Sequence, residues 1–243
     1  SIGYRNRNTR FGSCWKSCLV VIKYLDMIFT IGHTIQSLDD FYDMLQHYDV
    51  NCIIDVRSMP FSQHAPQFNK ESLCIYLKGK NVLYAHFGKE FGARRDDCLQ
   101  YVHNGNEDFM QVNFELGVKT DNFKAGINRL DKALSQGRTI ALMCTEANPL
   151  DCHRFSFISR YLYDNKYDIM HIMRNKETHE IQLKTHKELE SRMINEYVRK
   201  GKLSGEGDLF SESNDEKKLR DEAYRIKNRE IGYKPMMEEK IID

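Results

Sequence analysis

Short apolar runs alternate with longer amphipathic stretches along most of the chain. The runs that have the length of strands are 27–31, 51–56, 82–87, 139–143 and 168–173, and 180–183 is a shorter candidate that extends the same sheet. Apolar residues follow one another in these runs with few interruptions. This pattern favours strands that are buried on both faces, as the strands of parallel sheets are.

Helical periodicity fills the intervals between these runs. Ser37 is the expected N-cap of the first helix, and Asp121 is the expected cap of another helix that ends at Gly137. Further helices are expected around 71–77, 109–116, 155–162 and 186–199. Strands that alternate with helices predict an α/β fold, in which an open, mostly parallel sheet carries helices on both faces as a Rossmann-like three-layer sandwich.

The composition changes at both ends of the chain. Residues 1–26 lack periodicity, so we expect a poorly ordered N-terminal extension, which either precedes a natural start at Met27 or is an ordinary N-terminal arm. A single α/β domain is expected over 27–200. Beyond it, 201–243 combines a flexible linker of small, polar and charged residues with a helical C-terminal extension, whose aromatic and aliphatic residues at 223–233 can dock on the domain.

Length, charge and cysteine content narrow the class of protein. The 243 residues carry a net charge of +1, so the chain has no overall basic field of the kind that marks strong nonspecific binders of nucleic acid. No apolar stretch reaches the roughly 20 residues of a membrane helix, so no membrane partner is expected. The seven cysteines are odd in number and widely spaced, which favours reduced thiols in a cytoplasmic protein.

Candidate chemistry is densest between the fourth strand and the helix that follows it. Residues 143–154, the cysteine turn, have the sequence Met-Cys-Thr-Glu-Ala-Asn-Pro-Leu-Asp-Cys-His-Arg. Seven residues separate Cys144 from Cys152, and Glu146, His153 and Arg154 lie in the same turn. Two thiols, a carboxylate, an imidazole and a guanidinium therefore crowd one strand-to-helix connection.

Other polar residues follow the ends of the neighbouring strands. The full set is His33, Asp55 with Arg57, His86, Cys144 with Glu146, and 152–154. Because ligands of open α/β sheets bind beyond the carboxyl ends of the strands, we expect these groups to meet at one edge in a shared polar pocket. Each also has a structural interpretation: Asp55 and Arg57 form an ion pair, His33 satisfies a loop, and His86 lies in the core. His171, inside a strand, is expected to be structural.

The cysteine turn fits an anion site or a nucleophile. Backbone N–H groups at the start of a helix favour a phosphate or carboxylate, which Arg154 would bind with two hydrogen bonds. Cys152, beside the same arginine, would have a lowered pKa and act as a nucleophile. In the structural alternative, both cysteines are small core residues and Arg154 pairs with Glu146 or Asp55.

The same turn also fits a metal site. Cys144, Cys152 and His153 offer soft and borderline ligands, and His33 or Glu146 would be the fourth. The spacing differs from that of standard zinc fingers. A transition metal is therefore a weaker expectation than a polar or anionic ligand.

A set of motifs in fixed order indicates a family. They are Thr30-Ile31-Gly32-His33, Asp55-Val56-Arg57 with Pro60 and Ser62, Phe68, Tyr84, Cys144-x-Glu146-x-x-Pro149-x-x-Cys152-His153-Arg154, and His171-Ile172. Over 27–174 the chain resembles the domain of unknown function 488 family, and its longer form resembles bacterial members with a C-terminal Ala-Tyr-Arg-x-x-Asn-like segment. The resemblance implies a cytoplasmic α/β protein with a polar pocket, and it implies no reaction.

The chain departs from the family pattern at several positions of the expected pocket. Thr34 stands where the family usually has serine, and Gln63 stands where it has arginine, which removes one candidate anion contact. Phe87-Gly88 and Phe91-Gly92 replace a Leu-Gly-Gly near Tyr84.

Three functions remain open from the sequence. The first is an enzyme that acts on a phosphorylated or nucleotide-like small molecule. In it, the anion contacts are Arg57, Arg154, Ser62 and Tyr84, the acid–base groups are Asp55, Glu146 and His33, and the nucleophile or proton carrier is Cys152 or His153. The second is a metal-binding or thiol-redox protein that uses Cys144, Cys152 and His153. The third is a module that binds or senses nucleotides or nucleic acid without catalysis. The oligomeric state stays open.

Overall fold

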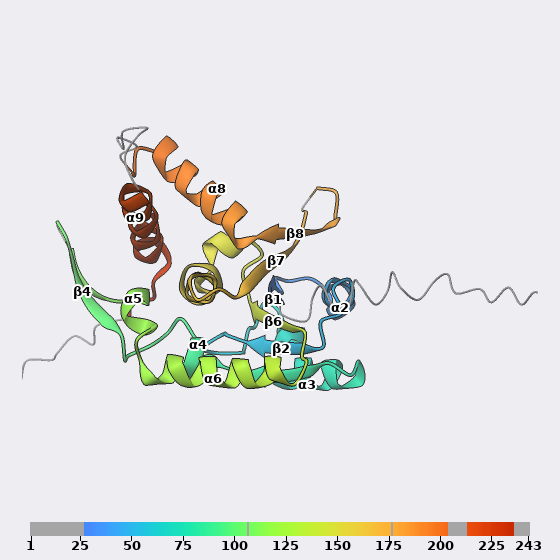
Figure 1. Cartoon of the computed structure of the whole chain (residues 1–243). Helices are drawn as coiled ribbons and strands as arrows, with labels where there is room; N and C mark the ends of the chain where they lie inside the picture. The colour runs from blue at the N-terminus through green and yellow to red at the C-terminus, as the bar shows by residue number, and fades with distance from the viewer. Residues whose placement is uncertain (1–26, 106, 176, 204–212, 236–243) are drawn as a thin grey trace, which may run out of the picture.

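The computed structural model describes residues 27–105, 107–175, 177–203 and 213–235 (Figure 1). The expected N-terminal extension at 1–26 lies outside the described residues, and so do 204–212 of the expected linker and 236–243. Among the described helices, none combines the length and the apolar character that crossing a lipid bilayer requires.

A six-stranded sheet forms the centre of the molecule. Its strands are β1 (Met27–Gly32), β2 (Cys52–Asp55), β3 (Leu83–His86), β6 (Ile140–Cys144), β7 (Asp168–Arg174) and β8 (Ile181–Thr185), in the spatial order β3-β2-β6-β1-β7-β8. Every neighbouring pair is parallel except β7 and β8, which are antiparallel. The predicted open, mostly parallel sheet is therefore confirmed, and the segment around 180–183 extends it as expected.

Helices cover both faces of this sheet. The main helices are α2 (Leu38–Gln46), α3 (Lys70–Gly79), α6 (Asp121–Ser135), α7 (Arg160–Asp164) and α8 (His186–Arg199), and the shorter ones are η1 (Pro66–Phe68), α4 (Gly88–Phe91), α5 (Phe114–Gly117) and η2 (Pro149–Asp151). Phe41 of α2 and Leu73 of α3 belong to the core on one face, with Phe29 of β1. Phe123 of α6 lies in the core on the other face, with Ile28 of β1. Successive side chains of β1 thus point to opposite faces of the sheet and belong to different cores.

The structure corrects the helix predicted around 109–116. Glu107–Val112 is a strand, β5, which pairs in antiparallel register with β4 (Leu99–Asn104), and only the short α5 follows. Gly105, at the tip of this hairpin, has a positive φ of 62°. Because Asn104 pairs with Glu107, the connecting dipeptide is Gly105-Asn106, which is one of the favoured sequences of two-residue hairpin turns and was the local signal for a hairpin.

Two helix boundaries also differ from the prediction. Thr120, and not Asp121, caps α6, because its hydroxyl oxygen accepts a hydrogen bond from the backbone N–H of Phe123 at 3.2 Å. The helix expected at 155–162 consists of a π-helical segment, η3 (Arg154–Ser159), followed by α7. π-Helical segments are rare and occur often at functional sites.

The C-terminal helix α9 (Ser213–Ile231) is hydrogen-bonded to the hairpin. Its Asn228 accepts from the backbone N–H of Phe114 at 2.7 Å and donates to the carbonyl of Val112 at 2.8 Å. The N–H of Val112 donates to the carbonyl of Tyr233 at 2.9 Å. Figure 1 shows α9 between the β4–β5 hairpin and α8.

A buried chain of hydrogen bonds links the sheet to α9. This histidine chain consists of Thr30, His171, His186, Tyr224 and Glu190, with consecutive distances of 2.8, 3.2, 3.0 and 2.7 Å. The Glu190 carboxylate only accepts, so the tyrosine hydroxyl donates to it and in turn accepts from His186. Each member before Glu190 therefore donates to the next one, in the direction from β1 towards α8.

Replacing Tyr224 by phenylalanine is expected to lower the free energy of unfolding by about 1–2 kcal/mol, because the buried His186 N–H and the Glu190 carboxylate each lose a partner. Urea denaturation at neutral pH measures the change. Tyr101→Phe is the matched control, since the Tyr101 hydroxyl bonds Asp108 on an exposed surface. An equal loss in both variants would show that the histidine chain contributes nothing special.

The low pKa values of two members of the histidine chain predict that the free energy of unfolding decreases in acid. Burial lowers the pKa of His171 well below its usual value and, with the positive charge of Arg220, lowers the pKa of His186 to about 3. Because the unfolded histidines bind protons below pH about 6.5, the free energy of unfolding decreases as pH falls from there towards the folded-state values. We expect a loss of about 1 kcal/mol for each histidine between pH 7 and pH 5.5. Urea denaturation at both pH values should show a smaller loss in His186→Gln, and an unchanged loss would contradict this origin.

Candidate functional site

The cysteine turn packs directly onto the end of the neighbouring strand. Cys144, the last residue of β6, lies opposite Gly32 of β1. The backbone N–H of His33 donates to the carbonyl of Cys144 at 3.0 Å, and the N–H of Thr34 donates to that of Thr145 at 2.9 Å. A Cβ atom on Gly32 would lie 1.9 Å from the carbonyl oxygen of Glu146, so this approach requires glycine.

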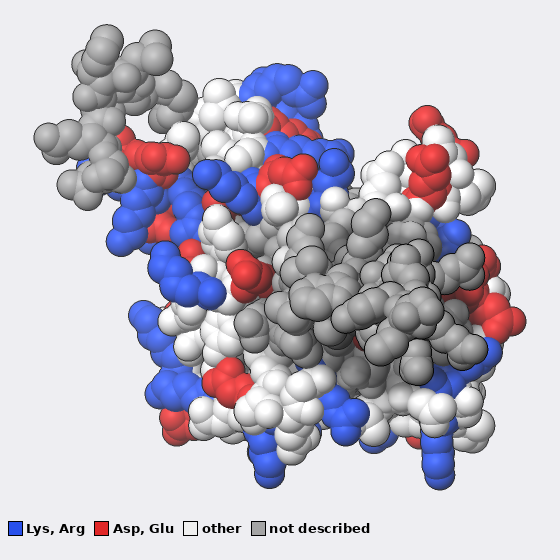
Figure 2. All heavy atoms as spheres, turned by 45° about the vertical axis from the view of Figure 1, so that its right-hand side comes forward, with Lys and Arg blue, Asp and Glu red and all other residues white. Residues whose placement is uncertain are grey.

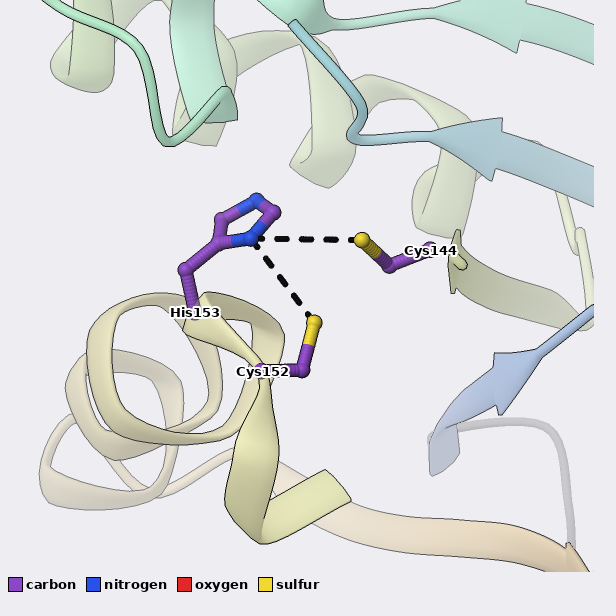
Figure 3. A group of neighbouring side chains, drawn as sticks. All are labelled: Cys144, Cys152 and His153. Carbon is purple, nitrogen blue, oxygen red and sulfur yellow. Dashed lines mark hydrogen bonds between the residues drawn. The ribbon is translucent and has the colours of Figure 1, made fainter. Parts of the chain in front are cut away.

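Two sulfurs and one ring nitrogen converge inside the turn (Figure 3). The Nδ1 atom of His153 lies 3.9 Å from the Sγ atom of Cys144 and 3.7 Å from that of Cys152. All three atoms lie within 4.8 Å of one another, and the three residues are 6%, 3% and 7% exposed in the order Cys144, Cys152, His153. This group is the ligand set of the metal site, which the sequence indicated more weakly than a site for a polar or anionic ligand.

The other ring nitrogen fixes the tautomer of His153. Its Nε2 atom lies 3.1 Å from the carbonyl oxygen of Val56, which can only accept, so Nε2 carries the proton. Nδ1 therefore directs a lone pair at the two sulfurs. A histidine that donates its distal N–H to a carbonyl in this way is oriented for metal binding.

The two thiols differ in acidity. The hydrogen bond between Cys144 and Cys152, together with burial, raises the pKa of Cys144 well above the usual value. Burial alone would also raise the pKa of Cys152, but the hydrogen bond from Cys144 and the positive charge of Arg154 outweigh burial and hold that pKa well below its usual value. Cys152 is therefore the more acidic thiol of the pair.

Glu146 lies at the outer side of the same turn. Its side chain is exposed, yet partial desolvation and the negative charge of Cys152 raise the pKa of its carboxyl group above the usual value. Because its pKa is raised, this carboxyl group takes up a proton more readily than an ordinary glutamate does, which makes it the candidate proton carrier of the turn.

A second group of polar side chains fills the sheet edge beside the turn. We call His33, Asp55, Arg57 and Tyr84 the Asp55 cluster. Arg57 donates to both carboxylate oxygens of Asp55, from Nε at 2.9 Å and from Nη2 at 2.6 Å, and the Tyr84 hydroxyl donates to the same carboxylate at 2.7 Å. Asp55 is fully buried and Arg57 is 5% exposed. The structural interpretation of this pair as an ion pair is confirmed.

His33 completes the Asp55 cluster as a neutral side chain. Burial and the charge of Arg57 lower its pKa to about 4. Its Nδ1–H donates to the carbonyl of Thr34 at 2.7 Å, and its Nε2 accepts from Nη1 of Arg57 at 3.0 Å. The ring also stacks on Phe68, with centroids 4.3 Å apart.

The two arginines expected to contact an anion already bind the protein itself. Besides Asp55 and His33, Arg57 donates to the carbonyl of Phe68 at 2.9 Å. Arg154 is fully buried and donates to the carbonyls of Glu146 and Ala147 at 2.6 and 3.1 Å. Its Nε atom has no hydrogen-bond partner among the described residues. The guanidinium groups therefore hold the loops of this edge together.

The remaining predicted residues are Ser62, in a loop, and His86, the last residue of β3. The Ser62 hydroxyl oxygen accepts from the backbone N–H groups of His64 and Ala65 at 3.2 and 3.3 Å. His86 donates from Nε2 to the carbonyl of Arg57 at 2.8 Å. Sequence reasoning missed the carbonyl of Val56, which orients His153, because a backbone acceptor leaves no mark in the residue pattern. Sequence reasoning could have found Gly32, because this glycine stands directly before the candidate residue His33.

Comparison with known proteins identifies the family of the chain. The family model described as domain of unknown function DUF488 matches residues 37–162. No curated protein and no solved structure matches the chain significantly. The match contains most of the sheet edge, including Asp55, Arg57 and the whole cysteine turn, while His33, α8 and α9 lie outside it. The match spans just over half of the 243 residues, so the chain belongs to the DUF488 family.

Proposed function

We propose that the protein is a metal-dependent enzyme in which Cys144, Cys152 and His153 hold a transition metal ion such as Zn²⁺. The observation that carries this proposal is the convergence of their three donor atoms. In a tetrahedral site with Zn–S bonds of about 2.3 Å and Zn–N bonds of about 2.0 Å, sulfur and nitrogen ligands lie about 3.6 Å apart. The sulfur–nitrogen distances of 3.9 and 3.7 Å come close to this value before any ion is bound.

The donor set favours a catalytic centre over a structural one. Within the described ranges, no fourth histidine, cysteine or carboxylate joins the group. Structural zinc sites are closed by four protein ligands, whereas catalytic sites leave a position for water or substrate. The lowered pKa of Cys152 and the free lone pair of His153 favour the deprotonated ligands that a metal requires.

Glu146 is the proton carrier in this proposal. A Zn²⁺ ion in the site would lower the pKa of a water molecule or polarise a substrate oxygen. Glu146 follows the proposed ligand Cys144 by two residues, and the raised pKa of its carboxyl group favours the uptake of a proton from the reacting group. Zinc deaminases activate water with the same combination of Cys and His ligands and a glutamate that does not bind the metal. The proposed reaction is therefore hydrolytic.

The proposed substrate is a phosphorylated or nucleotide-like molecule, as the sequence predicts. Arg57 and Arg154 are engaged with carboxylate and carbonyl oxygens, so their proposed role is to support the site rather than to clamp the anion. Nucleic acid is a weaker proposal. On the face drawn in Figure 2, basic and acidic side chains of the described residues are interspersed, and an uninterrupted basic surface is what a nucleic-acid backbone favours.

A thiol-redox function is the second candidate, because the sulfurs of Cys144 and Cys152 lie within 4.8 Å of each other. In that reaction a small-molecule disulfide would accept two electrons and leave as two thiols, while the two cysteines lose their protons and form an intramolecular disulfide. The low pKa of Cys152 suits the attacking thiolate.

Metal analysis of the full chain, purified without an affinity tag and reconstituted with Zn²⁺, tests the proposal. We expect about one ion per chain, and loss of the ion in Cys152→Ser and His153→Gln. Cys74→Ser is the matched control, because Cys74 lies on α3 outside the site and its replacement should leave the metal content unchanged. Far less than one ion per chain in the folded protein would contradict the metal centre. A disulfide between Cys144 and Cys152 after exposure to glutathione disulfide would then favour the redox function.

A further inference from the structure

A cavity of about 350 Å³ lies between the β4–β5 hairpin, η3 and α9. It is separate from the cysteine turn, since none of Cys144, Cys152 and His153 lines it. Cavities that hold small ligands have volumes from about 300 Å³ upwards, so this one is large enough for a small metabolite. In Figure 1 the hairpin and α9 lie side by side at this place.

A buried hydroxyl group without a partner lines the cavity. Ser156, in the π-helical segment η3, is 2% exposed, and its Oγ atom has no hydrogen-bond partner among the described residues. A buried hydroxyl that makes no hydrogen bond costs about 1–3 kcal/mol, so buried polar groups normally have partners. A ligand in the cavity would supply the partner that the described residues do not.

The charge of the lining favours an anion. Arg160, Arg225 and Arg229 line the cavity, whereas Glu115 is its only lining carboxylate among the described residues. Arg160 is fixed above the Tyr224 ring, with 4.3 Å between its guanidinium carbon and the ring centroid, and it pairs with Asp221 at 2.7 Å.

Two of these arginines can turn to a ligand at low cost. Arg225 and Arg229 are about half exposed, and both pair with Glu222, at 3.7 and 2.9 Å. Arg225 also pairs with Glu115 at 3.4 Å. Exposed ion pairs contribute at most about 1 kcal/mol each, so a phosphate group in the cavity can replace these carboxylates at a small cost in free energy. The planar guanidinium group matches the oxygens of a phosphate with two parallel hydrogen bonds.

We propose that this cavity is a binding site for a small organic phosphate, a phosphate monoester no larger than a mononucleotide, which receives hydrogen bonds from Ser156 and Arg225. The site is independent of the proposed metal centre. It is completed by α9, which supplies Arg225 and Arg229 and is held against the hairpin by Asn228. Because α9 lies outside the family match at 37–162 while Ser156 and the hairpin lie inside it, the site is formed jointly by the shared domain and the C-terminal extension of this chain.

Titration calorimetry of the full chain with AMP, ribose 5-phosphate, inorganic phosphate and citrate tests this site. We expect at least one of the two phosphate monoesters to bind with a dissociation constant below about 1 mM, and Arg225→Gln to weaken that binding by about tenfold or more. Arg192→Gln is the matched control, since it removes the same charge from an exposed position on α8, and it should leave the affinity unchanged.

Ser156→Ala gives a second test, in which a loss of affinity cannot be attributed to a loss of folding. Removal of a hydroxyl that has no partner should leave the stability of the free protein unchanged or raise it, while the affinity for the phosphate monoester falls. No binding of either phosphate monoester, binding of citrate alone, or equal affinities in wild type, Arg225→Gln and Ser156→Ala would overturn the proposal.

Discussion

Replacing Asp55 by asparagine is expected to lower the free energy of unfolding by about 3–5 kcal/mol, because it leaves the guanidinium group of Arg57 buried without its counter-charge. Asp55 is fully buried and accepts four hydrogen bonds, three from Arg57 and one from Tyr84. An amide keeps the size of the side chain but replaces one accepting oxygen by a donor that faces other donors. Urea denaturation at neutral pH measures the loss.

An exposed carboxylate offers the matched control for this change. Asp108 also accepts from two side chains, the hydroxyl of Tyr101 and the ring of His103, but its side chain is 46% exposed. Asp108→Asn should therefore cost less than about 1 kcal/mol. If Asp55→Asn were no more costly than Asp108→Asn, the Asp55 cluster would not be the support of the sheet edge that its geometry indicates.

Metal content separates the support role of Asp55 from a ligand role. The three proposed ligands do not include Asp55, whose oxygens are occupied by Arg57 and Tyr84. Asp55→Asn, where it is still folded, should therefore bind about one metal ion per chain, the content that we expect for the wild type. Loss of the ion from the folded variant would assign Asp55 to the metal centre.

The strands and their polar ends could be predicted because their signals are local. Apolar runs mark β1, β2 and β6, and the rule that ligands bind at the carboxyl ends placed Cys144 and Asp55 at one edge. The β4–β5 hairpin was missed because its strands alternate weakly and lie largely at the surface, so helical spacing of a few apolar residues outweighed the turn signal of Gly105-Asn106.

The roles of the two arginines could not be predicted for a physical reason. Arg57 and Arg154 donate to the carbonyls of Phe68, Glu146 and Ala147, and every residue type carries such a carbonyl. Sequence chemistry therefore shows that a guanidinium group lies at the edge, but not whether backbone oxygens already occupy it. The orientation of His153 depends in the same way on the carbonyl of Val56.

Replacing Gly32 by alanine is expected to lower the free energy of unfolding by about 3 kcal/mol and to disturb the proposed metal centre. The new Cβ atom would lie 1.9 Å from the Glu146 oxygen, 2.7 Å from its carbonyl carbon and 3.1 Å from the Cα atom of Ala147. All three are backbone atoms, so no flexible side chain can move aside. Urea denaturation and metal analysis of the same samples measure both effects.

The metal centre should respond because the overlap pushes on the loop that joins its ligands. The Glu146 carbonyl that Gly32→Ala displaces also accepts from Arg154 at 2.6 Å, and this loop runs from Cys144 to Cys152. Gly79→Ala is the matched control, since an added Cβ there meets no atom within 4 Å at the end of α3, and it should be neutral or slightly stabilising. A Gly32→Ala variant with the stability and metal content of the wild type would mean that the turn can retreat from β1 without moving its ligands. A loss of metal from Gly32→Ala that remains folded would instead show that the close approach of the turn to β1 sets the geometry of the metal centre.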